Sequence, residues 1–149
     1  MFMYRIAEFI MIILLYLTVL VNNAYGTDQY DAIYMDNYDG DTATMMVELF
    51  PYPPIIVELK VRLWGVDTPE MLGKCLDEKQ LARKAKQYVH DVLSDALEIK
   101  IKIMGKDKYG RVAALIMYDD NDLASELLME GLARPYHGGR RESWCEWSS

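Results

Sequence analysis

Hydrophobic and polar residues alternate along several short segments of the chain, and this period of two is typical of half-buried β-strands. Residues 57–64 and 97–104 show the alternation regularly, with Arg62 on the polar side of the first segment. Residues 112–118 are almost continuously apolar, which is typical of a central strand. These segments predict three strands.

The segment nearer the N-terminus predicts a hairpin. Residues 30–35 and 42–50 are rich in β-formers, and Asp39-Gly40-Asp41 between them is a strong turn signal. The sequence therefore predicts five strands in total.

Two segments have helical spacing instead. The first predicted helix starts with a capping-box-like Asp77 and Gln80 and runs to about Asp95. A second, over 123–130, is predicted to be capped by Asp122 and ended by Gly131. Apolar residues recur at helical spacing in the first helix at Leu81, Ala85, Tyr88, Val89, Val92 and Ala96. Three strands, a helix, two strands and a helix predict an α+β fold, the five-stranded OB-fold barrel with flanking helices.

An apolar leader precedes this pattern. Residues 9–21 form an uncharged apolar run of 13 residues, followed by the small-residue stretch Ala24-Tyr25-Gly26. A bilayer span needs about 20 residues, so this length suits a signal peptide better. We interpret residues 1–26 first as a cleaved signal peptide, then as an uncleaved membrane anchor, and last as a buried core helix. The first two interpretations export residues 27–149, to a secreted or envelope-associated location.

Length and charge limit the possible functions. The 149 residues suit one compact domain, and the net charge of −7 is unusual for a protein that binds nucleic acid. The acidic excess lies between Thr27 and Leu59, however, and from Lys60 onward the two signs balance. A locally positive groove is compatible with this distribution.

The chain has two cysteines, Cys75 and Cys145. In an exported protein such a pair can form one disulfide, here between a mid-chain loop and the tail, but two separate thiols are an equal alternative. His90 and His137 have no partner at the spacing of zinc ligands.

Three polar segments carry residue types that phosphodiester hydrolysis requires. Asp41 and Asp67 are hard oxygen donors suited to calcium, and Arg62 and Arg111 can each form a two-pronged contact with phosphate. Glu70 follows a proline in a short turn and is a candidate general base. The segments are residues 39–42, 62–70 and 107–111. Each alone is better explained as an ordinary turn or a solvated strand residue, but their combination is much less common by chance.

With these motifs the sequence resembles the staphylococcal nuclease-like (thermonuclease) family, from about Tyr30 to Tyr136. The shared motifs are Val66-Asp67-Thr68-Pro69-Glu70, Asp107-Lys108-Tyr109-Gly110-Arg111 and Glu130-Gly131-Leu132-Ala133. The resemblance implies that Asp41 and Asp67 bind Ca²⁺ through carboxylates, together with the backbone carbonyl of Thr68.

The same resemblance implies the remaining roles. Glu70 would be the general base, and Arg62 and Arg111 would bind the scissile phosphate and stabilise the transition state. Lys108 and Tyr109 correspond to residues that contact a neighbouring phosphate.

The resemblance also implies that Tyr136 stacks on a base of the substrate. The family's last helix is longer than the segment after Gly138 can form, so Trp144 and Trp147 are interpreted as pinning a short tail to the barrel.

The sequence thus predicts a monomeric, calcium-dependent nuclease that hydrolyses DNA or RNA with low sequence specificity and contacts a membrane only through an uncleaved leader. A noncatalytic nuclease-like module that binds nucleic acid or protein is the main alternative. An envelope-tethered adaptor is a third.

Overall fold

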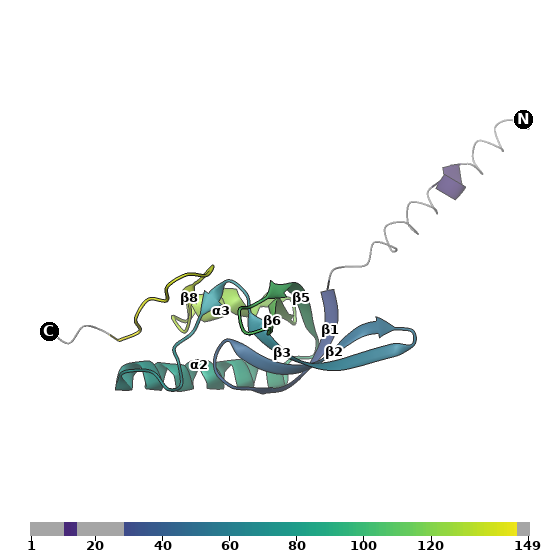
Figure 1. The fold of residues 1–149 in the computed structure, drawn as a ribbon. Helices are drawn as coiled ribbons and strands as arrows, with labels where there is room; N and C mark the ends of the chain where they lie inside the picture. The colour runs from purple at the N-terminus through teal and green to yellow at the C-terminus, as the bar shows by residue number, and fades with distance from the viewer. Residues whose placement is uncertain (1–10, 15–28, 146–149) are drawn as a thin grey trace, which may run out of the picture.

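The computed structural model describes residues 11–14 and 29–145, and five strands in this part of the chain close into a small barrel (Figure 1). The strands pair in the order β3-β2-β1-β5-β6, and a parallel pairing of β3 with β6 closes the ring. The other pairs in the ring are antiparallel. The strands are β1 (Gln29–Asn37), β2 (Thr42–Pro51), β3 (Pro54–Leu63), β5 (Ile99–Lys106) and β6 (Val112–Tyr118). The predicted α+β OB-fold barrel is confirmed.

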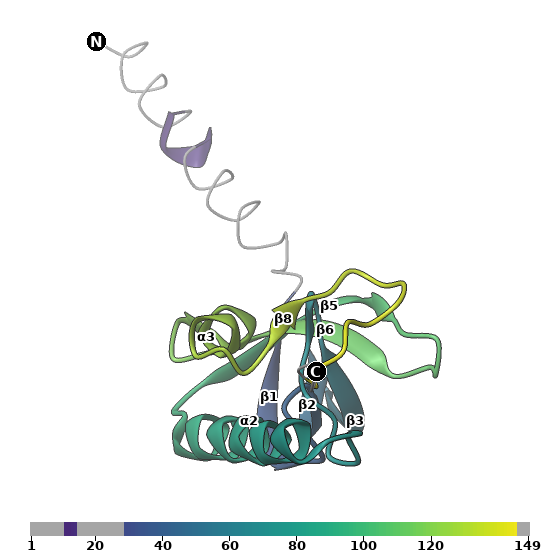
Figure 2. The ribbon, with the colours of Figure 1, turned by 90° about the vertical axis from the view of Figure 1, so that its left-hand side faces the viewer.

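Shorter elements cover the barrel. Figure 2 shows α2 along one side of it, with α3 and β8 on the opposite side. These elements are α2 (Leu76–Asp95), α3 (Leu123–Met129), β4 (Val66–Asp67), β7 (Asn121–Asp122) and β8 (Arg134–Pro135). The two-residue strands were not predicted, because two residues are too few to show a period.

The alternation along the strands builds the core. On β2, Ala43, Met45 and Val47 are buried, while Thr44 and Met46 between them are only half-buried. Each fully buried aliphatic side chain contributes about 1.5–3 kcal/mol relative to an exposed one. The core therefore fixes the register of the strands that carry the polar residues at their ends.

The long helix begins earlier than predicted. Cys75, not Asp77, is the N-cap of α2, and its Sγ accepts a hydrogen bond from the Glu78 amide over 3.5 Å. The capping-box prediction was wrong because a half-cystine occupies the cap. The helix ends at Asp95 as predicted, and its buried positions are Glu78, Ala82, Ala85, Val89 and Leu93.

Strand β5 begins at Ile99, two residues later than predicted. The Asp119 carboxylate accepts hydrogen bonds from the amides of Leu97 and Glu98, at 3.0 and 2.9 Å, which holds these residues in the connection from α2. Gly131 does end α3, with a φ of 66° that favours glycine.

Close packing at Gly40 positions the first hairpin turn. A Cβ at Gly40 would lie 2.7 Å from the Ala85 Cβ and 2.9 Å from the Thr68 Cγ2. Only glycine allows the turn to approach both α2 and the segment after β4. This contact brings Asp41 beside Thr68.

The predicted leader, residues 1–26, lies outside the described residues except for 11–14, which form an exposed helical turn. Among the residues that the structure describes, no helix has the length and apolar character needed to cross a membrane. Cleavage of the leader stays a prediction.

Candidate active site

A cleft of about 710 Å³ opens at one end of the barrel, and the three predicted segments all line it. A fourth segment, from Tyr136 to Arg141, also lines it, and of this segment only Tyr136 was predicted as a site residue. Eight of the nine predicted site residues line the cleft. The ninth, Asp67, is 5% exposed and covered by tail residues, as described below.

Asp41 is held at the base of the cleft by three donors. Its Oδ2 accepts from the Thr68 amide over 3.1 Å, and its Oδ1 accepts from the Thr42 hydroxyl over 3.1 Å. The Arg62 guanidinium forms an ion pair with the same Oδ1. Asp41 is therefore buried, ionic and fixed in orientation.

Arg62 lies between the two predicted metal ligands. Besides pairing with Asp41, its Nη2 is 3.6 Å from Asp67 Oδ1 and donates to the Val66 carbonyl over 3.2 Å. The side chain is 9% exposed. Arg62 lies on the polar face of β3, as predicted, but it is buried there because the carboxylates and the end of β4 enclose it.

Asp67 is surrounded by residues from the tail. Arg141 Nε lies 2.9 Å from its Oδ1, and the Trp144 indole donates to its Oδ2 over 3.3 Å. Burial raises the pKa of the Asp67 carboxyl, against the opposing effects of Arg141 and the indole. The Arg141 contact is an ion pair without hydrogen-bond geometry, so within the described part of the chain Asp67 Oδ1 accepts no hydrogen bond.

These atoms fit a hard cation. Asp67 Oδ1 and Thr68 Oγ1 are buried oxygens without hydrogen-bond partners among the described residues, and the Asp41 carboxylate faces the same region. Oxygen donors without imidazole or thiolate suit calcium or magnesium rather than zinc. The residues present therefore fit the ion that the sequence predicts.

Asp39 adds a third carboxyl and was not predicted as a site residue. It lines the cleft, and its Oδ1 accepts from the Asp41 amide over 3.1 Å. Burial and the neighbouring Asp41 charge raise its pKa to about 6. Asp39 is visible in the sequence as the first residue of Asp39-Gly40-Asp41, but we interpreted it only as a turn former, because Asp and Gly are common in turns.

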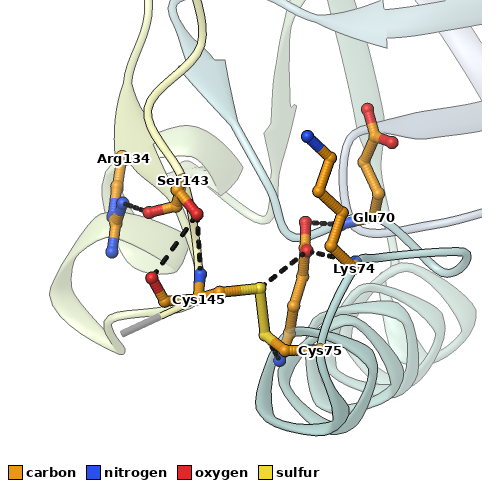
Figure 3. Close-up of a disulfide and its surroundings, with 7 residues drawn as sticks. Glu70, Lys74, Cys75, Arg134, Ser143 and Cys145 are labelled. Carbon is orange, nitrogen blue, oxygen red and sulfur yellow. Dashed lines mark hydrogen bonds between the residues drawn. A yellow bond between two sulfur atoms is a disulfide. The ribbon is translucent and has the colours of Figure 1, made fainter. Parts of the chain in front are cut away.

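Glu70, the predicted base, projects into the cleft and forms an ion pair with Arg141. Its backbone is positioned by the buried Glu78 of α2. The Glu78 carboxylate accepts from the Lys74 amide over 2.9 Å and from the Glu70 amide over 3.4 Å (Figure 3). Glu78 is three residues after the N-cap Cys75, where a capping glutamate is common, so the correct helix start would have identified it.

Arg111 is oriented by the turn before β6. The Asp107 carboxylate accepts from Arg111 Nε over 2.6 Å and from the Tyr109 and Arg111 amides at 2.8 and 2.9 Å. Although burial opposes the charged form, these hydrogen bonds lower the pKa of Asp107. Arg111 Nη1 also donates to the Thr42 hydroxyl over 3.1 Å.

The predicted substrate-binding residues lie along the rim. Lys108 Nζ lies 4.9 Å from the centre of the Tyr109 ring, which is 72% exposed. Tyr136 is fixed by a 2.8 Å hydrogen bond from its amide to the Gly65 carbonyl and by one from its hydroxyl to the Gly139 carbonyl, at 2.9 Å. One exposed and one anchored aromatic ring thus border the cleft.

Cys75 and Cys145 form a disulfide, with Cα atoms 5.9 Å apart (Figure 3). Of the two alternatives for the cysteines, the structure has the bonded pair. Trp144 packs under Arg134, whose guanidinium carbon is 4.0 Å from the ring centre. The predicted structural role of Trp144 is confirmed, while Trp147 lies outside the described residues.

The sequence was also compared with known proteins. The profile of a family described as "Staphylococcal nuclease homologue" matches residues 60–144, which include Arg62, Asp67, Glu70 and Arg111 but not Asp41. No curated protein matches the chain. The family match spans more than half of the chain and ends in the tail that covers Asp67. The chain therefore belongs to the family of staphylococcal nuclease homologues.

Proposed function

We propose that this protein is a calcium-dependent nuclease that hydrolyses phosphodiester bonds of DNA or RNA with low sequence specificity. One observation carries the proposal: two arginines, a glutamate and the buried Asp41 line one cleft, and a second buried aspartate, Asp67, lies beside Arg62 at its edge. They come from three separate segments of the chain, 39–42, 62–70 and 107–111, so neighbouring positions in the sequence do not by themselves explain their proximity.

The charged residues of the cleft have different proposed roles. Arg62 and Arg111 are rigid two-pronged donors, and each is already oriented by a carboxylate that leaves further N–H groups available. They would bind the nonbridging oxygens of the scissile phosphate and stabilise the charge that develops there. Glu70 would orient a water molecule and accept its proton.

Asp41, Asp67 and the Thr68 carbonyl would hold the calcium ion. When bound, the ion would supply positive charge to the phosphate and reduce the electrostatic repulsion among the carboxylates. The donor set described above supports this assignment.

The rim supports a loosely selective substrate site. Tyr109 and Tyr136 offer aromatic faces, and stacking on such faces does not depend on base identity. Lys108 would contact a phosphate next to the scissile one. The acidic net charge of −7 predicts weak, salt-sensitive binding rather than tight retention.

Export is part of the proposal. A structural disulfide is most stable in an oxidising compartment, and this agrees with an apolar leader that directs a monomeric protein out of the cytosol. The membrane would be contacted only through an uncleaved leader. Intact-mass measurement of the product from an exporting host distinguishes cleavage near Ala24 or Gly26 from retention of Met1.

The principal rival is a noncatalytic module that binds nucleic acid or protein. Incubating the purified protein with single-stranded DNA, first with calcium and then with excess chelator, separates the two. We expect cleavage that stops with chelator and falls about 10²–10⁴-fold in Glu70→Gln, with an unchanged circular dichroism spectrum. Binding without cleavage would establish the rival.

A further inference from the structure

The tail after β8 is a loop fixed at both ends. At one end β8 pairs with β4, with Pro135 opposite Val66 and Arg134 opposite Asp67. At the other end the disulfide joins Cys145 to the N-cap of α2. We call residues 136–145 the C-terminal strap.

The middle of the strap lies across the candidate active site. Arg141 contacts two carboxylates at once, through Nε to Asp67 Oδ1 and through Nη1 to Glu70 Oε1. Three residues later the Trp144 indole takes the second oxygen of Asp67. One strap thus occupies both oxygens of a predicted metal ligand and one oxygen of the predicted base.

We propose that the C-terminal strap is a tethered competitor of the metal ion, with the Arg141 guanidinium taking the position of a cation between Asp67 and Glu70. This inference rests on the proposed function in one respect, namely that the competing ion is calcium. Calcium binding and strap binding exclude each other at Asp67, and Glu70 is released to act on water only when Arg141 leaves it.

The charges around Arg141 support a cation position. Burial alone would lower the pKa of its guanidinium, but the charges of Asp67, Asp41 and Glu70 raise it. The same carboxylates repel one another and need a positive partner. Arg62 supplies one such charge from β3, and Arg141 supplies a second from the C-terminal strap.

The strap is well suited to open and close. The Arg141 side chain is 37% exposed, and its ion pair with the exposed Glu70 is weak, so a divalent ion mainly has to replace the guanidinium at Asp67. The disulfide keeps the displaced arginine close to the site, which raises its effective concentration and makes closure rapid when the ion leaves. The disulfide therefore influences the calcium concentration at which the ion displaces the C-terminal strap.

Calorimetric titration of calcium tests the competition without depending on activity. We expect Arg141→Gln to bind calcium about 3- to 10-fold more tightly than the unaltered protein, with the difference shrinking at high salt. Arg140→Gln is the matched control: it removes the same charge one residue away, where no ion pair forms among the described residues, and its affinity should stay near the unaltered value. Equal or weaker binding by Arg141→Gln overturns the proposal.

The tether has its own test. The double substitution Cys75→Ser and Cys145→Ser should also tighten calcium binding, because an untethered strap competes less well. If Arg141→Gln tightens binding and the cysteine pair does not, the role of the disulfide is refuted. Thermal unfolding of the double variant shows whether it is folded, and reduction of the unaltered protein by dithiothreitol provides a second way to open the tether.

A spectroscopic measurement follows the strap directly. The indole N–H resonance of Trp144, assigned with Trp144→Phe, should move during calcium titration as its hydrogen bond to Asp67 is lost. A resonance unaffected by saturating calcium contradicts displacement of the strap. Calcium competition in a protein that cleaves no nucleic acid would end the nuclease proposal and leave the strap standing, whereas absence of calcium binding in all variants would end the strap proposal.

Discussion

Arg111 Nη1 donates to the Thr42 hydroxyl over 3.1 Å, and that hydroxyl donates in turn to Asp41 Oδ1 over 3.1 Å. A single threonine thus connects the proposed phosphate-binding arginine to a proposed calcium ligand. Its one proton is committed to the carboxylate, so its lone pair is available to the guanidinium. The Thr42 side chain therefore fixes the phosphate-binding arginine relative to the calcium ligand.

The first prediction concerns Thr42→Val, which keeps the shape of the side chain and removes both hydrogen bonds. We expect kcat/KM for single-stranded DNA to fall about 3- to 10-fold, with a smaller loss of calcium affinity, because each hydrogen bond contributes about 0.5–1.5 kcal/mol. Thr44→Val is the control, since Thr44 lies two positions along β2 and does not line the cleft. Equal losses in both variants would mean that the effect comes from the strand, not from the connection.

The second prediction separates the two arginines by stability. Both Arg62→Ala and Arg111→Ala should reduce turnover about 10²–10³-fold, as expected for the loss of a charge-stabilising donor. Only Arg62→Ala should also unfold at a markedly lower temperature, because it leaves the buried Asp41 carboxylate without its cation and Asp67 with Arg141 alone, at a cost of about 3–5 kcal/mol. Calorimetric unfolding measures the difference.

Calcium provides the control for this prediction. An ion that binds only the folded state stabilises it, and here it would neutralise the carboxylates that lose the charge of Arg62. Saturating calcium should therefore restore more of the lost stability in Arg62→Ala than it adds to Arg111→Ala. A similar gain in both would show that Arg62 and the ion do not share these carboxylates.

Most strands of the barrel and most residues of the site could be predicted from the sequence. Strand positions followed from alternation, and Asp41, Arg62, Glu70 and Arg111 followed from residue chemistry together with the family resemblance. What escaped prediction depends on tertiary contacts. Arg141 lies in a Gly-rich tail without any period, and tertiary contacts, namely the pairing of β8 with β4 and the disulfide between Cys75 and Cys145, place it on Asp67.

The helix start shows the same limitation. Cysteine is not a usual N-cap, so local propensity favoured Asp77 as the cap. With the helix start misplaced, Glu78 was not recognised as the capping glutamate. The burial of Arg62 was also hidden, because alternation assigns a face of the strand but not what covers that face.

The third prediction follows from the raised pKa of Asp39. In the folded protein this pKa is about 6, above the ordinary aspartate value of 3.8, so the folded state binds the proton more tightly than the unfolded state. The charged carboxylate therefore destabilises the metal-free protein above pH 6, and this penalty disappears as the pH falls to about 4. Asp39→Asn should raise the metal-free unfolding temperature by about 3–6 °C at pH 7.5 and change it little at pH 4.

Scanning calorimetry at the two pH values provides the measurement, and Asp36→Asn, at an exposed position of β1, is the control. A rise in unfolding temperature that is equal at both pH values would contradict the explanation by charge.

The fourth prediction concerns the choice of metal and follows from how the ligands are assembled. Asp41 adjoins a hairpin turn, whereas Asp67 and Thr68 lie at and beyond the end of a two-residue strand. Calcium accepts 6–8 oxygen ligands in irregular geometry, while magnesium demands a nearly ideal octahedron and gives up water reluctantly. Ligands from two separate segments, partly covered by guanidinium groups, favour the more tolerant ion. We therefore expect calcium to support cleavage and magnesium to support little.

Substitution of the ligands completes this prediction. Asp41→Ala and Asp67→Ala should each raise the calcium concentration that gives half-maximal cleavage, whereas Asp36→Ala should not, because its exposed carboxylate lies outside the cleft. The two effects should differ. Asp41→Ala removes a ligand that already holds the Thr68 amide and Arg62, so it should also lower the unfolding temperature. Asp67→Ala removes the carboxylate for which the ion and Arg141 compete, so it should also release the strap. Vigorous cleavage with magnesium, unaffected by either substitution, would show that the ion binds elsewhere and that these aspartates serve the fold alone.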